Sequence, residues 1–268
     1  MREQFKSDGP QFEHGLEELR WLETVSSTND VLADLARGQS VAVLSWNQTE
    51  GRGRLGRRWE SLRGRSLALS YCPGLSISHF GDSGIGLGLI SLQVAGCLVD
   101  ALEPFVEGSV TIKWPNDVLI EGKKIAGILG EITPREQLIL GIGLNVNHSR
   151  DELPTQASTS LVLNGFDPSK SMVSFLELLF ERFRSLFQTD SLTSSFSLRP
   201  ILPKLETLGQ RIRIYYPSGA EVVGLADALG SSGQLVVKVE PSGNRLEVSS
   251  ADIVHLRADQ IGNTRNAD

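Results

Sequence analysis

"VTIKWPNDVLIEGKKIAGILGEI", residues 110–132, alternates apolar runs with turn signals. The turns are marked by Pro115-Asn116-Asp117 and by Glu121-Gly122, residue types that favour tight bends. The apolar runs beside them have the length and the β-branched content of strands. Because tight turns join neighbouring strands of opposite direction, the stretch predicts three consecutive antiparallel strands.

Apolar runs on both sides of this stretch extend the predicted sheet and add helices. The first helix can be capped by Ser27 or Thr28 and ends at Gly38, after Arg37. A buried helix and a strongly amphipathic one follow further along the chain. Strands are predicted over 41–46, 66–72 and 137–147, and the two later helices over 86–103 and 169–188.

A change of composition near Arg199-Pro200 divides the chain. Beyond it, short strand-like segments alternate with glycine-containing turns over residues 211–256, which predicts a small β-barrel. The expected fold class is α+β, a mixed or antiparallel sheet with helices followed by that barrel. The predicted units are an N-terminal arm at 1–20, a first domain at 21–199, a second at 200–258 and a tail at 259–268.

The composition predicts a cytoplasmic protein with no structural metal. No run approaches the roughly 18 to 20 apolar residues of a membrane helix, and the N-terminus lacks the apolar centre of a signal peptide. The four histidines have no metal-ligand spacing. Cys72 and Cys97 are expected to be buried free thiols, although two cysteines suffice for one disulfide. The net charge of −6 argues against broad nucleic-acid binding.

This acidic chain gathers positive charge in one segment. From Arg52 to Arg65 inclusive lie six of its 26 lysines and arginines, interleaved with glycines. Residues 51–56 match the dinucleotide pattern G-x-G-x-x-G, but the charged, glycine-broken stretch that follows cannot open the apolar helix that the pattern requires. Guanidinium groups hold carboxylates or phosphates bidentately, and Gly51 and Gly53 let the backbone approach a ligand. The segment predicts an anion-binding loop, with a solvated basic loop as the alternative.

A second cluster of charge lies among the apolar residues of the predicted hairpin. Lysines are rarely buried unless paired, so Lys123 and Lys124 either complete a solvent-facing turn or send one amine inward. Asp117, after Pro-Asn, has the same two interpretations, as a turn residue or as a site residue. Asn145 ends a glycine-thinned strand, where its amide either contacts a ligand or terminates the strand.

Taken together, four blocks of this sequence resemble the biotin protein ligases, the enzymes that attach biotin to carboxylase carrier domains. The resemblance covers roughly residues 21–257, and its two long blocks are specific. The four blocks are "SSTN" at 26–29, "QTEGRGRLGRRW" at 48–59, "KWPNDVLIEGKKIAGIL" at 113–129 and "GIGLNVN" at 141–147.

The resemblance implies an activity and a fold. Biotin and ATP form biotinyl-5′-adenylate with the help of Mg²⁺, and biotin then passes to a lysine of the biotin carboxyl carrier protein of acetyl-CoA carboxylase. The implied first domain is a catalytic domain like those of class II aminoacyl-tRNA synthetases, and the implied second domain is an SH3-like β-barrel.

The resemblance also implies roles for individual residues. Lys124 and Arg54 are the expected catalytic groups, and Asp117 is the expected metal ligand. The arginine loop is expected to move and to close over the adenylate, which hydrolyses readily in water. The implied biotin-binding residues are Ser27, Thr28, Gln48, Gly51, Arg52, Arg54 and Lys124, and the implied ATP or adenylate residues are Arg52, Arg54, Trp59, Asn116, Asp117, Lys124 and Asn145.

Many relatives carry an N-terminal DNA-binding module that represses the biotin operon. About 20 residues precede the first block here, which is too few for such a module, so the expectation is an enzyme without repressor activity. The expected assembly is a monomer or a weak homodimer, without nucleic acid or membrane as partner. The alternative functions are a lipoate or octanoate ligase or transferase on the same fold, and a biotin or adenylate sensor without turnover.

Overall fold

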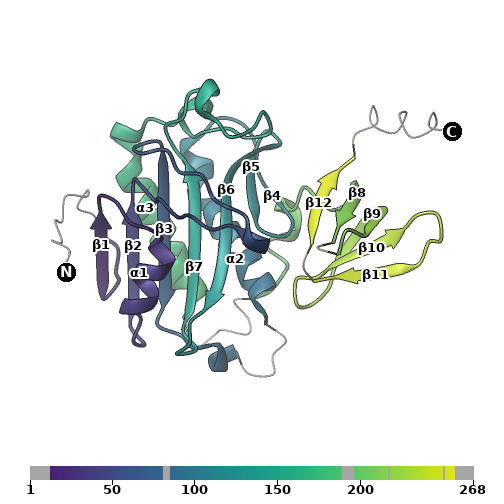
Figure 1. Cartoon of the computed structure of the whole chain (residues 1–268), viewed down its shortest axis with the longest axis horizontal. Coiled ribbons are helices and arrows are strands. Elements are labelled where there is room, and N and C mark those ends of the chain that lie inside the picture. The colour runs from purple at the N-terminus through teal and green to yellow at the C-terminus, as the bar shows by residue number, and fades with distance from the viewer. Residues whose placement is uncertain (1–12, 81–84, 189–195, 217, 250, 257–268) are drawn as a thin grey trace.

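Two β-sheets form the framework of the protein (Figure 1). The computed structural model describes residues 13–80, 85–188, 196–216, 218–249 and 251–256. The first sheet has seven strands in the order β1-β2-β3-β7-β6-β5-β4. Their bounds are β1 Glu18–Leu22, β2 Ser40–Ser45, β3 Ser66–Pro73, β4 Val110–Lys113, β5 Asp117–Ile120, β6 Lys123–Ile132 and β7 Leu138–Asn145.

The first sheet is mixed, as predicted. Strand β1 pairs with β2 in parallel, and every other neighbouring pair is antiparallel. The three antiparallel strands predicted over residues 110–132 are confirmed as β4, β5 and β6. The three predicted helices are also present, as α1 Thr28–Leu35, α2 Leu87–Leu102 and α3 Pro168–Leu186.

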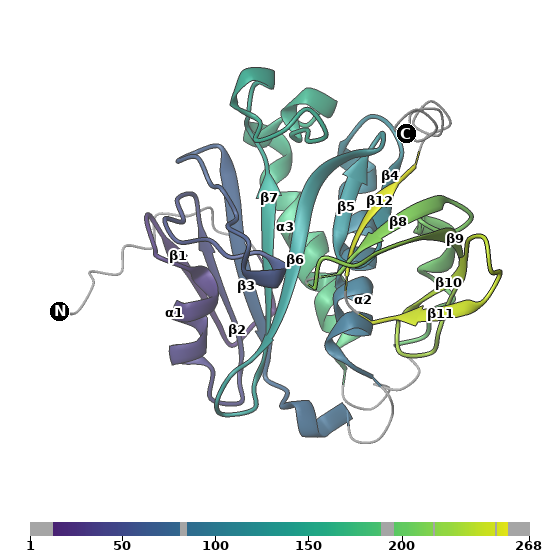
Figure 2. The same ribbon diagram turned by 45° about the vertical axis from the view of Figure 1, so that its right-hand side comes forward.

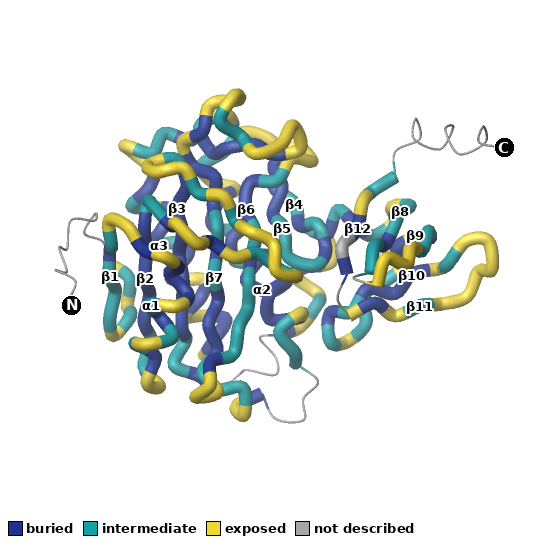
Figure 3. The backbone as a smooth tube through the Cα atoms, viewed as in Figure 1, coloured by how far each residue is buried: buried dark blue, intermediate teal, exposed yellow. Residues whose placement is uncertain are grey.

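Helices lie on both faces of this sheet (Figures 1 and 2). Helices α2 and α3 pack on one face, where they meet Ala42, Leu44, Leu140 and Ile142 in the main core. Helix α1 packs on the opposite face, in a smaller cluster with the alternate residues, which are Val41, Val43, Cys72 and Ile139. Because successive strand side chains point to opposite faces, both faces of β2 are buried. Figure 3 shows the resulting buried centre of the sheet.

The structure corrects two predictions near the N-terminus. Glu18, Leu19 and Arg20 belong to β1, so the predicted arm of residues 1–20 is too long. Its first twelve residues lie outside the described part of the chain. Helix α1 ends at Leu35, before Arg37 and Gly38, and its N-cap Ser27 makes no side-chain capping bond. The sequence suggested a longer, capped helix because short polar residues and glycine carry those signals even where tertiary contacts decide otherwise.

A third correction concerns α2. By length and composition, the described segment Leu87–Phe105 is long and apolar enough to cross a membrane, contrary to the expectation that no run comes close. It is mostly buried, however, between the first sheet and α3, which is the environment of a core helix. Cys97 on this helix and Cys72 on β3 are free thiols, and Cys97 is half-buried rather than buried.

The second sheet is antiparallel and has five strands in the order β11-β10-β9-β8-β12. It confirms the short strands predicted after residue 200. Figure 2 shows it beside β4 and β5. Its strands are β8 Arg211–Tyr215, β9 Glu221–Leu229, β10 Leu235–Val239, β11 Arg245–Val248 and β12 Asp252–His255.

Trp114, just after β4, joins the two sheets. The side chain is 1% exposed, and its indole Nε1 donates a hydrogen bond to the carbonyl of Gly233, 2.9 Å away, in the turn before β10. Its backbone N–H donates to Thr207 Oγ1 at 2.9 Å. A buried donor and a buried acceptor satisfy each other here, so the contact sets the position of the second sheet against the first.

We expect Trp114→Phe to lower the free energy of unfolding by about 1 to 3 kcal/mol, because the Gly233 carbonyl loses its donor in a buried place. Chemical denaturation measures this change. The control is Trp46→Phe, the same substitution at a half-buried site beside Trp21, where a smaller loss is expected. A Trp114→Phe protein as stable as the wild type would contradict the proposed role of Trp114 in joining the two sheets.

Candidate active site

A cavity of about 740 Å³ opens on the face of the first sheet that carries α1. The segment that follows β2 crosses this face in front of β7 and β6 (Figures 1 and 3). The lining comes from the start of α1, from residues 48–59, from 113–117 and from β6 and β7. The second sheet contributes Tyr215, Ile253 and Val254, so both sheets shape the cavity.

Glycines form the floor of the cavity. Gly127 on β6 pairs with Gly143 on β7, and Gly141 lies two residues away on the same face. A Cβ atom at Gly143 would lie 2.2 Å from Cε2 of Trp59, and one at Gly141 would lie 2.5 Å from Oδ1 of Asn29. Side chains from α1 and from residues 48–59 therefore approach the strands as closely as only glycine allows.

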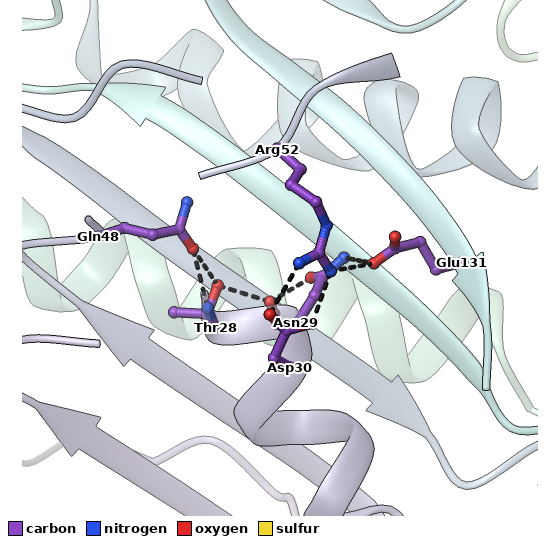
Figure 4. A network of polar contacts seen from close by, with 7 residues as sticks. Thr28, Asn29, Asp30, Gln48, Arg52 and Glu131 are labelled. Carbon is purple, nitrogen blue, oxygen red and sulfur yellow. Dashed lines mark hydrogen bonds and ion pairs between the residues drawn. The ribbon is translucent and has the colours of Figure 1, made fainter. Parts of the chain in front are cut away.

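One end of the cavity carries neutral polar groups (Figure 4). Gln48 Oε1 accepts hydrogen bonds from the backbone N–H of Thr28 at 2.8 Å and from its Oγ1 at 3.1 Å. Both acceptor directions of the carbonyl are used, so the amide N–H₂ of Gln48 is the part left to meet a ligand. Ser27 and Thr28 are each 3% exposed and line the same end.

The other end is cationic. Lys124 Nζ lies 2.6 Å from Asp117 Oδ1, and Arg54 Nη1 donates to Asn116 Oδ1 at 3.3 Å. Asn116 is held in turn by its Nδ2, which donates to the carbonyl of Ile128 at 2.7 Å. Lys124 and Arg54 thus face the same cavity, where they contact the adjacent residues Asp117 and Asn116. The structure supports the second interpretation of the lysine pair, in which one amine points inward. This amine belongs to Lys124, and Lys123 is exposed.

Burial changes the proton affinity of two cations at this end. Desolvation lowers the pKa of Arg54, partly opposed by the nearby charge of Asp117. Desolvation also lowers the pKa of Lys113, and the negative charge of Asp117 again opposes this shift. Among the residues that the structure describes, six basic residues line the cavity against one acidic residue, Asp117. In a chain of net charge −6 this concentration favours an anionic ligand.

Residues 51–59 form a short hairpin over the cavity, which we call the arginine hairpin. Gly53 N–H donates to the Arg57 carbonyl at 2.7 Å, and Trp59 N–H donates to the Gly51 carbonyl at 2.9 Å. The tip is the tight turn Arg54–Gly56, where Leu55 has φ 57°. Trp59 lies on the glycine floor, with Lys124 Nζ 5.5 Å from its ring centroid, within reach of a cation–π contact.

The structure brings most of the predicted site residues together. The following predicted residues line the cavity: Ser27, Thr28, Gln48, Arg52, Arg54, Trp59, Asn116, Asp117 and Lys124. Asn145 does not line it, because the side-chain Nδ2 donates to the carbonyl of Thr159 at 3.1 Å. Gly51 lies behind the lining, where a Cβ would come 2.6 Å from Gln48 Nε2.

Other residues of the site were missed by the sequence analysis. Asn29, Asp30 and Glu131 join the polar network of Figure 4 from α1 and β6. The hydroxyl of Ser70 on β3 extends the network to Asn29. Two of these residues carry a sequence signal: Asn29 closes the block "SSTN", and Glu131 is a carboxylate in the otherwise apolar strand "IAGILGEI". Among the residues that the structure describes, no group of three or more His, Cys, Asp and Glu side chains is arranged to hold a metal ion.

The cavity suits an elongated ligand with a neutral polar head and an anionic tail. Its donors and acceptors lie at the α1 end, its cations at the Lys124 end, and the apolar, glycine-thinned sheet lies between them. The cationic end would stabilise negative charge that develops on a phosphoryl or carboxylate group.

Comparison with known proteins identifies the family. The model of the Biotin/lipoate A/B protein ligase family matches residues 21–147. A biotin–[acetyl-CoA-carboxylase] ligase of Mycobacterium tuberculosis is 32% identical over 245 residues, which cover 88% of this chain and 87% of that protein. A protein of the same name from Paracoccus denitrificans is 30% identical over 247 residues, 84% of this chain and 95% of that protein.

Among solved structures, the biotin protein ligase from Aquifex aeolicus in complex with biotin and ATP has a TM-score of 0.69 and 26% identity to this chain. The likeness covers 90% of this chain and 100% of that one, so it includes both sheets. With its relatives aligned over most of their length and its cavity at the matched motifs, the chain belongs to the biotin/lipoate A/B protein ligase family.

Proposed function

We propose that this chain is a biotin protein ligase, which activates biotin with ATP and transfers it to a lysine of a biotin carboxyl carrier protein. One observation carries the proposal: Lys124 and Arg54 meet at one end of a cavity whose other end presents Gln48, Thr28 and Ser27. The relatives named biotin–[acetyl-CoA-carboxylase] ligase support this substrate and point to the carrier domain of acetyl-CoA carboxylase as the acceptor.

The first step joins two anions. A carboxylate oxygen of biotin attacks the α-phosphorus of ATP, the bond from that phosphorus to the bridging oxygen breaks, and pyrophosphate leaves. Lys124 and Arg54 would neutralise charge on the reacting oxygens and hold the two substrates in line. The Gln48 amide and the Thr28 hydroxyl would hold the ureido ring, whose polar edges match fixed donors and acceptors in an apolar pocket.

The second step transfers the acyl group. The neutral amine of the carrier lysine attacks the biotinyl carbonyl of the adenylate, the bond to the phosphate oxygen breaks, AMP leaves, and the nitrogen loses a proton to solvent. The arginine hairpin would shield the mixed anhydride from water until the carrier arrives. Trp59, which lies on the glycine floor beside Lys124, would pack against the adenylate.

Asp117 and Asn116 fit a Mg²⁺ ion that arrives with ATP. Magnesium is commonly held by one or two protein oxygens together with substrate phosphates, and these two oxygens lie beside Lys124 and Arg54 at the cationic end. When bound there, the ion would supply further positive charge to the phosphate oxygens of ATP.

The finer features of the family are part of the same proposal. They comprise a first domain of the class II aminoacyl-tRNA synthetase type, predicted over residues 21–199 and extended here to include all of β1, an SH3-like barrel over 200–258 and a role for Asn145 on the nucleotide side. They also comprise a cytoplasmic location, a monomer or weak homodimer, and no nucleic acid or membrane as partner. The antiparallel second sheet and the buried position of the apolar helix α2 support the barrel and the location.

A pyrophosphate-exchange assay tests the proposal against the alternatives. We expect exchange of labelled pyrophosphate into ATP that depends on biotin, because adenylate formation is reversible on the enzyme. The family model also includes lipoate ligases, so lipoate and octanoate are run in parallel. Exchange with lipoate or octanoate alone would identify a lipoate ligase, and tight binding of biotin without exchange would identify a sensor.

Replacing Lys124 tests the cationic end. We expect Lys124→Ala to lower the rate of biotin-dependent exchange by about 100-fold or more, because one preorganised charge at the reacting phosphate is lost. Lys123→Ala is the matched control, since it removes the neighbouring, exposed lysine from the same strand. Exchange near the wild-type rate in Lys124→Ala would remove this residue from its proposed role.

Adding one methyl group to the floor tests the position of the cavity. The Cβ of Gly143→Ala would meet the Trp59 ring at 2.2 Å, so either the ring or the strand must move. We expect kcat/KM for biotin-dependent exchange to fall about tenfold or more, since a small misplacement of site groups is costly. Gly96→Ala on α2, with 3.8 Å of room, is the control. Unchanged kcat/KM in Gly143→Ala would contradict this placement of the active site.

A further inference from the structure

Two arginines of the arginine hairpin have different surroundings. Arg54 reaches the cationic end of the cavity, but Arg52 turns toward carboxylates (Figure 4). Its Nη1 and Nη2 donate to the two oxygens of Asp30, each at 2.7 Å, and Nη2 also lies 3.4 Å from Glu131 Oε2. This single guanidinium therefore connects the hairpin to α1 and to β6.

The charge around Arg52 makes it a poor ligand for a substrate anion. One guanidinium faces two carboxylates, so the group of three has a net charge of −1 when all are ionised. A phosphate that approached it would meet the negative charge of Asp30 and Glu131 as well. The hydrogen bonds that Arg52 donates to Asp30 raise the pKa of Arg52 despite partial desolvation, so the guanidinium keeps its charge.

Glu131 is itself held in place. Asn29 Nδ2 donates to Glu131 Oε2 at 2.5 Å, and Asn29 Oδ1 lies 2.5 Å from the hydroxyl of Ser70. Asn29 reaches this position because Gly141 beneath it has no side chain. The Ser70 hydroxyl also lies 2.7 Å from Thr28 Oγ1, which bonds Gln48. A continuous polar network thus runs from the neutral end of the cavity to the partner of Arg52.

The arginine hairpin is consequently fastened on two sides. Arg54 bonds Asn116 near its tip, and Arg52 bonds Asp30 and Glu131 at its base. Trp59 comes from the opposite strand of the hairpin and lies on the glycine floor. Loss of the Arg52 anchor would remove the contacts of the hairpin with α1 and β6, while the Arg54–Asn116 bond, the bond from Arg58 to the Thr49 carbonyl and the packing of Trp59 remain.

We propose that Asp30 and Glu131 are positioning residues that hold the arginine hairpin over the cavity through Arg52, and that Arg52 acts as the anchor of this cover rather than as a ligand of the substrate phosphate. The proposal rests on the proposed ligase function, in which the cover retains the adenylate. Neither acidic residue lines the cavity. Asp30 acts on retention through Arg52, whereas Glu131 also contacts Asn29, so Asp30→Asn is the cleaner test of the anchor.

The test compares Asp30→Asn and Glu131→Gln with Asp34→Asn. Asp34 is exposed one turn further along α1, so its variant makes the same charge change away from the hairpin. The first measurement is limited trypsin cleavage after Arg54 and Arg57 without substrates. We expect cleavage about three to ten times faster in Asp30→Asn and Glu131→Gln than in Asp34→Asn, with melting temperatures alike, because the cover opens more often.

The second measurement is steady-state pyrophosphate release from biotin and ATP without a carrier protein, which reports escape of the adenylate. We expect this rate to rise about three- to tenfold in Asp30→Asn and Glu131→Gln, whereas a merely structural weakening would lower it. Equal cleavage and equal release in Asp30→Asn and Asp34→Asn would overturn the proposal. Absence of biotin-dependent pyrophosphate release from the wild type would instead overturn the ligase function. The trypsin cleavage rates would still test whether Asp30 and Glu131 hold the arginine hairpin through Arg52.

A double-mutant cycle separates an anchor from a substrate ligand. If Arg52 works through Asp30, then Asp30→Asn adds little to the effects of Arg52→Gln on cleavage and on release. If Arg52 binds the substrate phosphate, Arg52→Gln lowers exchange far more than Asp30→Asn, and the two effects multiply. The second pattern would overturn the proposal.

Discussion

The absence of side chains at three glycine positions on one face of β6 and β7 is the constraint on which the site depends. Gly127, Gly141 and Gly143 alternate with residues such as Ile128 and Ile142, which pack into the core between the sheet and α2. Because alternate residues of a strand point to opposite faces, the two strands are filled on the core side and open at these glycines on the other side. The hydrophobic core therefore loses few packing contacts to the cavity, and Trp59 and Asn29 can approach the strand backbone directly.

The same geometry separates two kinds of polar interaction above that floor. Gln48, Thr28 and Ser70 form a neutral network at one end, and Arg54, Lys113 and Lys124 bring positive charge to the other. Each end is anchored by backbone or side-chain partners, so its groups are oriented before any ligand binds. A molecule with a polar ring and an acidic tail matches both ends, as biotin does in the proposed function.

Sequence analysis anticipated much of this arrangement. The turn residues near Asn116 and Gly122 predicted the three-stranded part of the sheet, and the interleaved arginines and glycines predicted the anion-binding loop. The errors have physical causes. The parallel partner of β1 comes from residues 40–45, so no local pattern reveals that residues 18–20 form a strand. Asn145 stays a predicted residue of the nucleotide side, although its Nδ2 donates to the Thr159 carbonyl and it lies outside the cavity lining.

By itself, the sequence determined the order of the strands and helices after β1, the surplus of positive charge near residues 52–65 and the family to which the motifs point, because periodicity, turn chemistry and motif spacing are local properties. Only the tertiary structure decided which arginine bonds Asn116 at the cationic end and which bonds carboxylates. Arg52 meets Glu131 from 79 residues away, and Asn29 meets it from 102 residues away. Such pairings follow from sheet register and helix placement, which no local segment encodes.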